Sequence, residues 1–322
     1  MANLSTKIIE LDENIFVIPG DTNIGIICSN NDDIVEVYII DSGSSEIDGD
    51  YILTVLKDYF DIQNKKFTVK AILTTHGHPD HFGGHNTIKE QTGCSLLAAK
   101  HEQCTMETPM NQCISIWGGY PPHELRTLFF KQIETYLDGF IGEETEYILS
   151  DGLKINFIEL KGHSHCGLAI IATSKNNKKT VFAGDCIFPR NEILRHSIPL
   201  IIQPNEFTEA LDRLGAIENV EWIIPGHGDF INKNIQETIE MDKIAILSTR
   251  KCIMDSLEDF IPHTIEEIIK YVADNNELNM TLTQYSFIAP TIRSYVSILH
   301  DEKKIKLMMK DNMLYFYRER AI

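Results

Sequence analysis

Residues 74–84 read Thr-Thr-His-Gly-His-Pro-Asp-His-Phe-Gly-Gly and follow directly on the apolar run 69–73. The apolar run predicts a buried strand, and the proline and glycines predict a turn that ends it. Four side chains that can bind a metal therefore lie at the carboxyl end of one strand, namely His76, His78, Asp80 and His81. Imidazole and carboxylate are ligands of zinc and of non-haem iron or manganese. The stretch therefore predicts a metal-binding loop.

Three more candidate ligands follow predicted strands further along the chain. His163 comes after the strand 152–160, Asp185 after the strand 180–183, and His227 after the strand 222–224. Taken alone, each is more typical of an ordinary loop residue. Binding sites of layered α/β folds lie on loops at strand ends, so the shared position favours a common site.

The rest of the pattern predicts strands that alternate with helices. Residues 48–60 carry apolar side chains at the spacing of one helical face. The other elements that we expect are strands at 7–19, 23–29, 34–40 and 168–172, and helices at about 85–91 and 206–217. Strand and helix in succession predict an α/β layered domain.

The ligand blocks, in their order along the chain, resemble the metallo-β-lactamase-fold superfamily. The matching residues are His76-x-His78-x-Asp80-His81, Gly162-His163-Ser164, Gly184-Asp185 and the Pro-Gly-His-Gly of residues 225–228. The resemblance implies an αββα sandwich. It also implies a centre of two divalent metals, with zinc as the first choice and iron or manganese as alternatives.

Matching residue by residue assigns a role to each ligand. The resemblance implies that His76, His78 and His163 hold the first metal, that Asp80, His81 and His227 hold the second, and that Asp185 bridges the two. Asp80 is also the candidate catalytic residue, because it could orient the nucleophile and pass a proton to the leaving group. His165 departs from the small residue that many relatives have, and we interpret it as exposed or as a neighbour of the ligands.

A centre of this kind implies hydrolysis. Two cations about 3.5–4 Å apart lower the pKa of a bridging water and provide a hydroxide nucleophile. We expect a hydrolase of a small ester, thioester or lactone with an anionic group, similar to glyoxalase II. The alternatives within the fold are a phosphodiesterase or ribonuclease and a mononuclear-iron sulfur dioxygenase. His78 argues against the diiron flavoproteins of the fold, which resemble His-x-Glu-x-Asp.

A basic cluster follows the predicted bridging ligand. Arg190, Arg195 and His196 lie within eleven residues of Asp185 in a chain of net charge −18. Arginine pairs with carboxylate or phosphate in a planar fork, so the cluster is a candidate for binding an anionic substrate group. The alternative is that these cations pair with acidic side chains at the surface.

The segment 101–148 interrupts the strand and helix pattern. It is rich in apolar side chains, including Trp117, Tyr120, Phe129 and Phe130. We expect either a lid or pocket wall, with Trp117 and Tyr120 as candidate substrate-binding residues, or an element that packs on the domain or a second subunit.

The tail predicts a second, smaller unit. A helical pattern runs from about residue 231 to 257, Thr264 and Glu267 predict a capping box for a helix to about 274, and further predictions are a helix at 290–299 and a hairpin at 306–317. Helices before a terminal hairpin resemble the winged helix of some hydrolases of this fold. We therefore divide the chain into a domain of residues 1–231 and a helical, winged-helix-like domain of residues 232–322.

Composition limits the partners and the location. A net charge of −18 opposes general binding to nucleic acid or an anionic membrane, so we expect a small-molecule substrate, with a homodimer as an open alternative. The first residues lack the features of a signal peptide, and no apolar run approaches the roughly 20 residues that span a membrane. Seven irregularly spaced cysteines do not predict a disulfide framework. We therefore expect a cytoplasmic protein.

Overall fold

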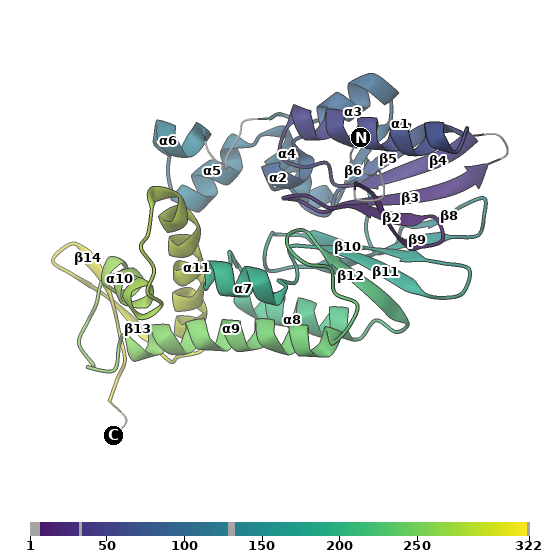
Figure 1. Cartoon of the computed structure of the whole chain (residues 1–322). Coiled ribbons are helices and arrows are strands. Elements are labelled where there is room, and N and C mark those ends of the chain that lie inside the picture. The colour runs from purple at the N-terminus through teal and green to yellow at the C-terminus, as the bar shows by residue number, and fades with distance from the viewer. Residues whose placement is uncertain (1–6, 32–33, 128–132, 321–322) are drawn as a thin grey trace.

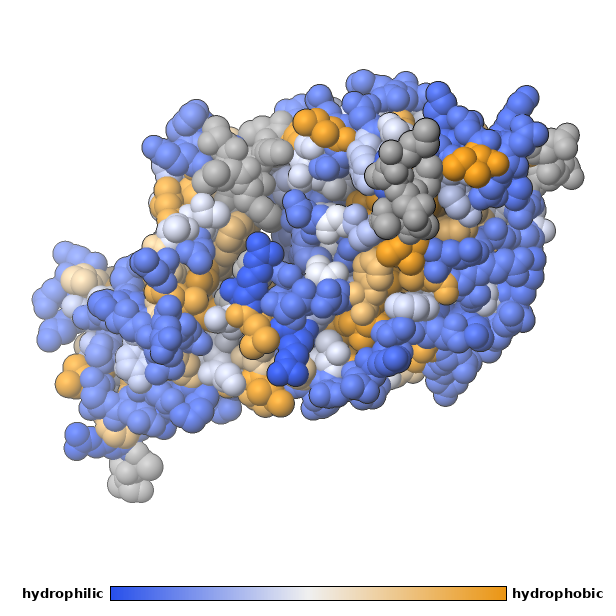
Figure 2. Space-filling model, in the orientation of Figure 1, coloured by the Kyte–Doolittle hydropathy of each residue, from blue (hydrophilic) through white to orange (hydrophobic). Residues whose placement is uncertain are grey.

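Two facing β-sheets with helices on both outer faces form most of the protein (Figure 1). The computed structural model describes residues 7–31, 34–127 and 133–320. The α/β sandwich predicted from the sequence is confirmed, and so are helices in the C-terminal part. The face drawn in Figure 2 is largely hydrophilic, and its apolar residues form separate patches.

The first sheet has seven strands in chain order. They are β1 (Ile9–Asp12), β2 (Ile15–Ile18), β3 (Ile24–Asn31), β4 (Ile34–Ile40), β5 (Lys66–Leu73), β6 (Ser95–Ala98) and β7 (Gly139–Phe140). The prediction of one strand at 7–19 was wrong, because β1 and β2 pair antiparallel around a turn at Asn14. Asn14 has a φ of 65°, a left-handed conformation that asparagine tolerates better than most residues.

The second sheet has five strands. Their order is β12 (Val220–Pro225), β11 (Lys179–Gly184), β10 (Gly167–Thr173), β9 (Lys154–Leu160) and β8 (Glu146–Ile148). β10 pairs antiparallel with β9 and β11, whereas β11 pairs parallel with β12. The carboxyl ends of β9, β11 and β12 therefore share one edge, and the loops with His163, Asp185 and His227 leave from it.

Three layers of apolar side chains hold the sandwich together. One layer fills the space between the sheets, and a second lies between the first sheet and α1 (Glu46–Ile62) and α3 (His85–Thr92). In α1, Ile52, Val55, Leu56 and Phe60 are buried, at the spacing of one helical face. The third layer covers the second sheet with α8 (Pro204–Gly215) and continues into the C-terminal helices.

The segment 101–148 contributes to both sheets as well as to helices. Besides β7 and β8, it contains most of the short helix Lys100–Glu102, then α4 (Gln103–Glu107), α5 (Met110–Trp117) and α6 (His123–Thr127). It is therefore more than the interruption expected from the sequence, since it adds an edge strand to each sheet. Phe129 and Phe130 lie outside the described residues.

The C-terminal part contains the expected helices and hairpin. These are α9 (Ile235–Asp255), α10 (Ile265–Asn275), α11 (Leu282–Asp301), β13 (Lys306–Lys310) and β14 (Met313–Tyr317). The capping box of Thr264 and Glu267 is present. The predicted start of the last helix at Pro290 was wrong, because a second capping box at Thr281 and Gln284 begins α11 earlier and leaves Pro290 inside it. The domain boundary at residue 231 stays a prediction.

All seven cysteines are free of disulfide bonds. In the described parts of the chain, no helix combines the length and the apolarity that membrane crossing requires.

We expect Phe182→Ala to lower the free energy of unfolding by about 3–5 kcal/mol, because the ring fills the layer between the sheets and is 2% exposed. Urea unfolding of the metal-free protein measures the change. Phe140→Ala is the matched control, since Phe140 is 48% exposed at the sheet edge. Equal losses for the two variants would contradict this account of the core.

Candidate metal centre

The loop after β5 carries four of the candidate ligands. β5 ends at Leu73, and α2 (Pro79–Phe82) is a single turn that begins with a proline, a residue that suits a helix start. The loop packs tightly on the segment after β4. A Cβ atom on Gly83 would lie 2.2 Å from the backbone carbon of Ser44, so only glycine allows this approach. The packing fixes the path of the ligand loop.

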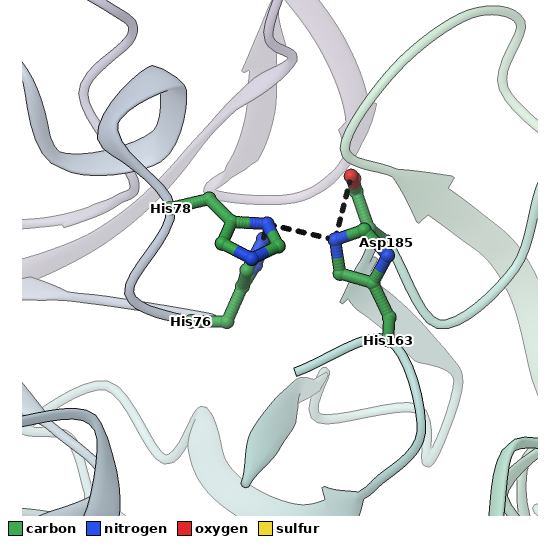
Figure 3. Close-up of side chains that lie close together, drawn as sticks. All are labelled: His76, His78, His163 and Asp185. Carbon is green, nitrogen blue, oxygen red and sulfur yellow. Dashed lines mark hydrogen bonds and ion pairs between the residues drawn. The ribbon is translucent and has the colours of Figure 1, made fainter. Parts of the chain in front are cut away.

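His76, His78, His163 and Asp185 form the first converging group, and all four are buried (Figure 3). His78 Nδ1 lies 2.9 Å from His76 Nε2 and 2.9 Å from His163 Nε2. His163 Nε2 lies 3.3 Å from Asp185 Oδ2. A single proton cannot satisfy three ring nitrogens that point at one another, whereas a cation between them accepts all their lone pairs.

Asp80, His81 and His227 form the second converging group. His227 Nε2 lies 3.3 Å from Asp80 Oδ2. Asp185 faces this group too, since its Oδ1 is 3.5 Å from His81 Nε2 and its Oδ2 is 3.5 Å from His227 Nε2. Asp185 thus lies between the two groups, where the sequence-based assignment puts the bridging ligand.

Hydrogen bonds from outside the centre orient three of the imidazoles. The outward Nδ1 atoms of His81, His163 and His227 contact Asp41 Oδ2 at 2.8 Å, the Leu200 carbonyl at 2.8 Å and the Asp21 carbonyl at 2.6 Å, respectively. In each ring the other nitrogen, Nε2, is left to face the centre. Such partners fix the ring orientation and raise the basicity of a metal-binding histidine.

Asp41 anchors the loop as well as His81. Its Oδ1 accepts a bond from the Thr75 backbone N–H at 2.8 Å, and its Oδ2 accepts one from the Thr75 hydroxyl at 2.7 Å. Sequence reasoning missed this role. The available signal was that Asp41 follows the strand 34–40 in the same way that the ligands follow theirs.

Glu102 fastens two ligand loops to each other and was also missed. Its carboxylate is 2% exposed, and it accepts hydrogen bonds from the Gly77 N–H at 3.0 Å and the Cys166 N–H at 3.0 Å. Gly77 lies between His76 and His78, and Cys166 lies three residues after His163. One buried carboxylate therefore sets the separation of the two loops that form the first group.

Burial and neighbouring charge determine the protonation of the ligands. Burial lowers the pKa of His78 to about 3, and burial with the adjacent His81 and His78 holds the pKa of His76 well below its usual value. Burial opposes ionisation of Asp185, but His227, His81 and His163 keep its pKa well below the ordinary value. The first group therefore offers neutral imidazoles and a carboxylate, the states that bind metal.

The second group draws positive charge. Burial disfavours charge on His81 and His227, yet Asp185, together with Asp41 for His81 and Asp80 for His227, outweighs burial and raises their pKa values to about 10 and about 12. Three buried atoms there have no hydrogen-bond partner among the described residues, namely Asp80 Oδ1, His81 Nε2 and Asp185 Oδ1. Buried polar atoms are rarely left unpaired. The second group thus favours positive charge, and it holds oxygen and nitrogen atoms that lack a partner. Divalent cations satisfy both conditions.

The loop after Asp185 is held by the C-terminal part of the chain. The Phe188 N–H donates to Asp242 Oδ2 of α9 at 3.2 Å, and burial raises the pKa of Asp242 to about 8. The Phe188 ring lies 6.0 Å from the ring of His163 and stacks on Phe207. A residue of α9 thus positions the loop that carries a ligand.

Two cavities open beside the ligands. The metal cavity, of about 660 Å³, is lined by residues of both ligand groups, including Asp80, Asp185 and His227. The α5–α11 cavity, of about 700 Å³, is lined by His101, Glu102, Gln112, Trp117, His165, Pro290 and Arg293 among others. Both cavities are lined by His78, His163 and Leu200, so they lie side by side at the first ligand group.

The candidate substrate residues are distributed unevenly. Arg195 of α7 (Arg190–His196) lines the metal cavity, and Trp117 lines the α5–α11 cavity. Arg190 and Tyr120 line neither of these two cavities, and the Tyr120 hydroxyl accepts a bond from Arg126 at 2.9 Å. His196 ends α7, and its side chain lies outside the described part of the chain. Substrate roles for these five residues stay predictions.

Comparison with known proteins agrees with the fold. A family model described as the metallo-beta-lactamase superfamily matches residues 17–227. The hydroxyacylglutathione hydrolase GloC of Haemophilus influenzae is 23% identical over 170 residues, which are 52% of this chain and 73% of that protein.

Solved structures show the same fold over nearly the whole chain. A metallo-beta-lactamase family protein from Thermus thermophilus has a TM-score of 0.72 at 16% identity, over 96% of this chain and 100% of its own. A beta-lactamase domain protein from Burkholderia ambifaria has a TM-score of 0.70 at 17% identity, over 99% of this chain and 95% of its own. The likeness includes the C-terminal part as well as the sandwich.

We expect the purified chain to bind two divalent cations and His227→Ala to bind about one, because the second group would keep only Asp80 and His81 besides the shared Asp185. Plasma mass spectrometry of protein dialysed against metal measures the ratio. His263→Ala is the control, since His263 pairs with Asp259 near the C-terminal hairpin. Two cations in His227→Ala would contradict the assignment of the second group.

We expect Glu102→Ala to weaken cation binding by about 10–100-fold, the usual effect of losing a partner that positions metal ligands. Glu102→Gln keeps an acceptor for one of the two N–H groups and should lose less. Competition with a chromogenic chelator measures the affinity, with the exposed Glu90→Ala as control. An unchanged affinity in Glu102→Ala would show that the two loops hold their separation without it.

Proposed function

The chain belongs to the metallo-beta-lactamase superfamily, and on that premise we propose that it is a hydrolase of a small ester, thioester or lactone that works with two divalent metals. The superfamily consists in general of hydrolases, and the present chain retains a candidate metal site. The observation that carries the proposal is the position of Asp185, whose carboxylate faces both converging groups.

The two groups divide the work of binding the metals. His76, His78 and His163 would hold one cation, Asp80, His81 and His227 would hold the other, and Asp185 would be shared. When bound, two divalent cations lower the pKa of a water between them and polarise the oxygen of the bond under attack. We infer zinc, because a set of imidazole and carboxylate donors suits it, although iron and manganese accept the same donors.

Asp80 is the residue that we propose to handle the proton. Its side chain lines the metal cavity and is 21% exposed, so it can reach a bound substrate. Burial favours its protonated form, but the hydrogen bond to His227 outweighs burial and lowers its pKa. An ionised Asp80 can accept a proton from the attacking water and donate it to the leaving group.

The class of substrate is inferred from the relatives and from the chemistry of the site. The name of the Haemophilus influenzae relative states that it hydrolyses hydroxyacylglutathione, and we carry over only the cleavage of an acyl bond. An anionic group on the substrate remains part of the proposal through Arg195, which lines the metal cavity. We infer a cytoplasmic location, because seven free cysteines suit a reducing compartment.

A second candidate function is cleavage of a phosphodiester, including ribonuclease activity. Helices α10 and α11 followed by the hairpin β13–β14 favour it, because this order of elements resembles a winged helix. The net charge of −18 opposes it. A mononuclear-iron sulfur dioxygenase is less consistent with the chain, because the second ligand group is complete. For the tail, residues 232–322, we infer a role in packing, in completing the pocket or in dimer formation.

We expect dialysis against a chelator to abolish hydrolysis and added zinc to restore it. A panel of a thioester, a lactone, a p-nitrophenyl ester and bis-p-nitrophenyl phosphate identifies the class, with faster turnover expected for the acyl compounds. Oxygen consumption by protein that contains one iron would contradict the proposal. Faster cleavage of the phosphodiester would favour the second candidate function, a phosphodiesterase.

Asp80→Asn should lower kcat by about 10²–10⁴-fold, the contribution that general acid–base catalysis makes. Metal content must be measured alongside, because Asp80 is also a candidate ligand. Asp212→Asn is the control, since Asp212 pairs with Lys243 at the surface of α8. An unchanged kcat in Asp80→Asn would show that Asp80 does not transfer the proton.

A further inference from the structure

We propose that the α5–α11 cavity binds the part of the substrate that does not react, and that this part is a neutral arm with an amide group, held by Gln112. The proposal rests on the proposed function, because it takes the metal cavity as the place where the bond is cleaved. It adds the chemical class of the arm and a residue that selects for it.

The two cavities adjoin at the first ligand group. His78, His163 and Leu200 line both, and in this proposal a molecule with its reactive bond in the metal cavity extends past His163 into the α5–α11 cavity. The second cavity has a volume of about 700 Å³, which is within the range of small-molecule sites. It therefore has room for an arm of several non-hydrogen atoms.

The wall of this cavity comes from two distant segments of the chain. Trp117 of α5 and Pro290 of α11 both line it, and the Trp117 ring lies 6.5 Å from the ring of Tyr285. Figure 1 shows α5 beside α11 at the end of the sandwich. Together with Ile116 and Leu200, these residues provide an apolar surface for the hydrocarbon portion of an arm.

The charged groups of the α5–α11 cavity already have partners. Arg293 donates to Glu266 Oε1 at 3.1 Å, and Glu102 accepts the two backbone N–H groups of the ligand loops. Among the described lining residues, Arg293 and Glu102 are the only arginine, lysine or carboxylate side chains. An anionic arm would compete with Glu266 for Arg293, whereas a neutral arm disturbs neither pair.

Gln112 supplies the specific contact. It is 7% exposed and lines the cavity, so its side chain is placed to contact a ligand there. If a ligand excluded water from this amide and left it unpaired, the cost would be about 1–3 kcal/mol. The carboxamide of glutamine has both donors and an acceptor, so it is satisfied by a ligand amide that accepts from Nε2 and donates to Oε1.

Two esters of equal length test this selection. On the metal-loaded full chain, we expect the p-nitrophenyl ester of N-acetyl-β-alanine to exceed p-nitrophenyl hexanoate in kcat/KM. Gln112→Leu should lower the ratio of the two values about 10-fold, mainly through KM, which corresponds to about 1.4 kcal/mol. Gln112→Met repeats the test with an unbranched side chain. Gln91→Leu, which removes an exposed amide from α3, should keep the ratio.

A binding experiment separates failure of this proposal from failure of the proposed function. In Trp222→Phe, the fluorescence of Trp117 reports occupancy of the cavity by N-propylacetamide or by 2-hexanone, which replaces the N–H with a methylene. Tighter binding of the amide, lost in Gln112→Leu, supports the proposal even if no ester is cleaved. Equal binding of amide and ketone, or a preference that survives in Gln112→Leu, overturns it.

Discussion

Five imidazoles and two carboxylates converge at the edge where the two sheets meet, and the rest of the structure serves this concentration of polar groups. Buried charge is tolerated only when it is paired or bound to a metal. The fold therefore supplies partners on the outer side of the rings, as Asp41 does for His81, and leaves the inner side for a cation. The parallel course of β9, β11 and β12 delivers ligands far apart in sequence to one edge.

The features of the fold and of the site that depend on a local pattern of residues could be predicted from the sequence. The ligand loop after β5, the strand ends before His163, Asp185 and His227, and the sandwich itself follow from short runs of residues. Asp41 and Glu102 could not be assigned in this way, because they act on backbone groups 25 to 64 residues away. No local spacing records such contacts.

Errors in the predicted elements have physical causes too. Three consecutive polar residues, Asp12, Glu13 and Asn14, interrupt the apolar pattern at the tight turn, so the prediction of one strand missed a local signal of the break between β1 and β2. Proline suits the first turn of a helix, which made Pro290 resemble a start, but the capping box at Thr281 determines where α11 begins. A pocket wall in the segment 101–148 was one of the two expectations, but the contribution of α11 was not predicted, since it depends on contact between two segments that are distant in the chain.

Gly226 has a consequence for how this chain can change over evolutionary time. A Cβ atom at that position would lie 2.2 Å from Asp185 Oδ1 and 2.6 Å from the ring of His81. Any larger residue therefore occupies space that the shared carboxylate needs. If Gly226 were replaced during evolution, other substitutions would first have to reposition the carboxylate of Asp185, so that it could still face both ligand groups. This backbone position therefore restricts which sequences are reachable by single substitutions.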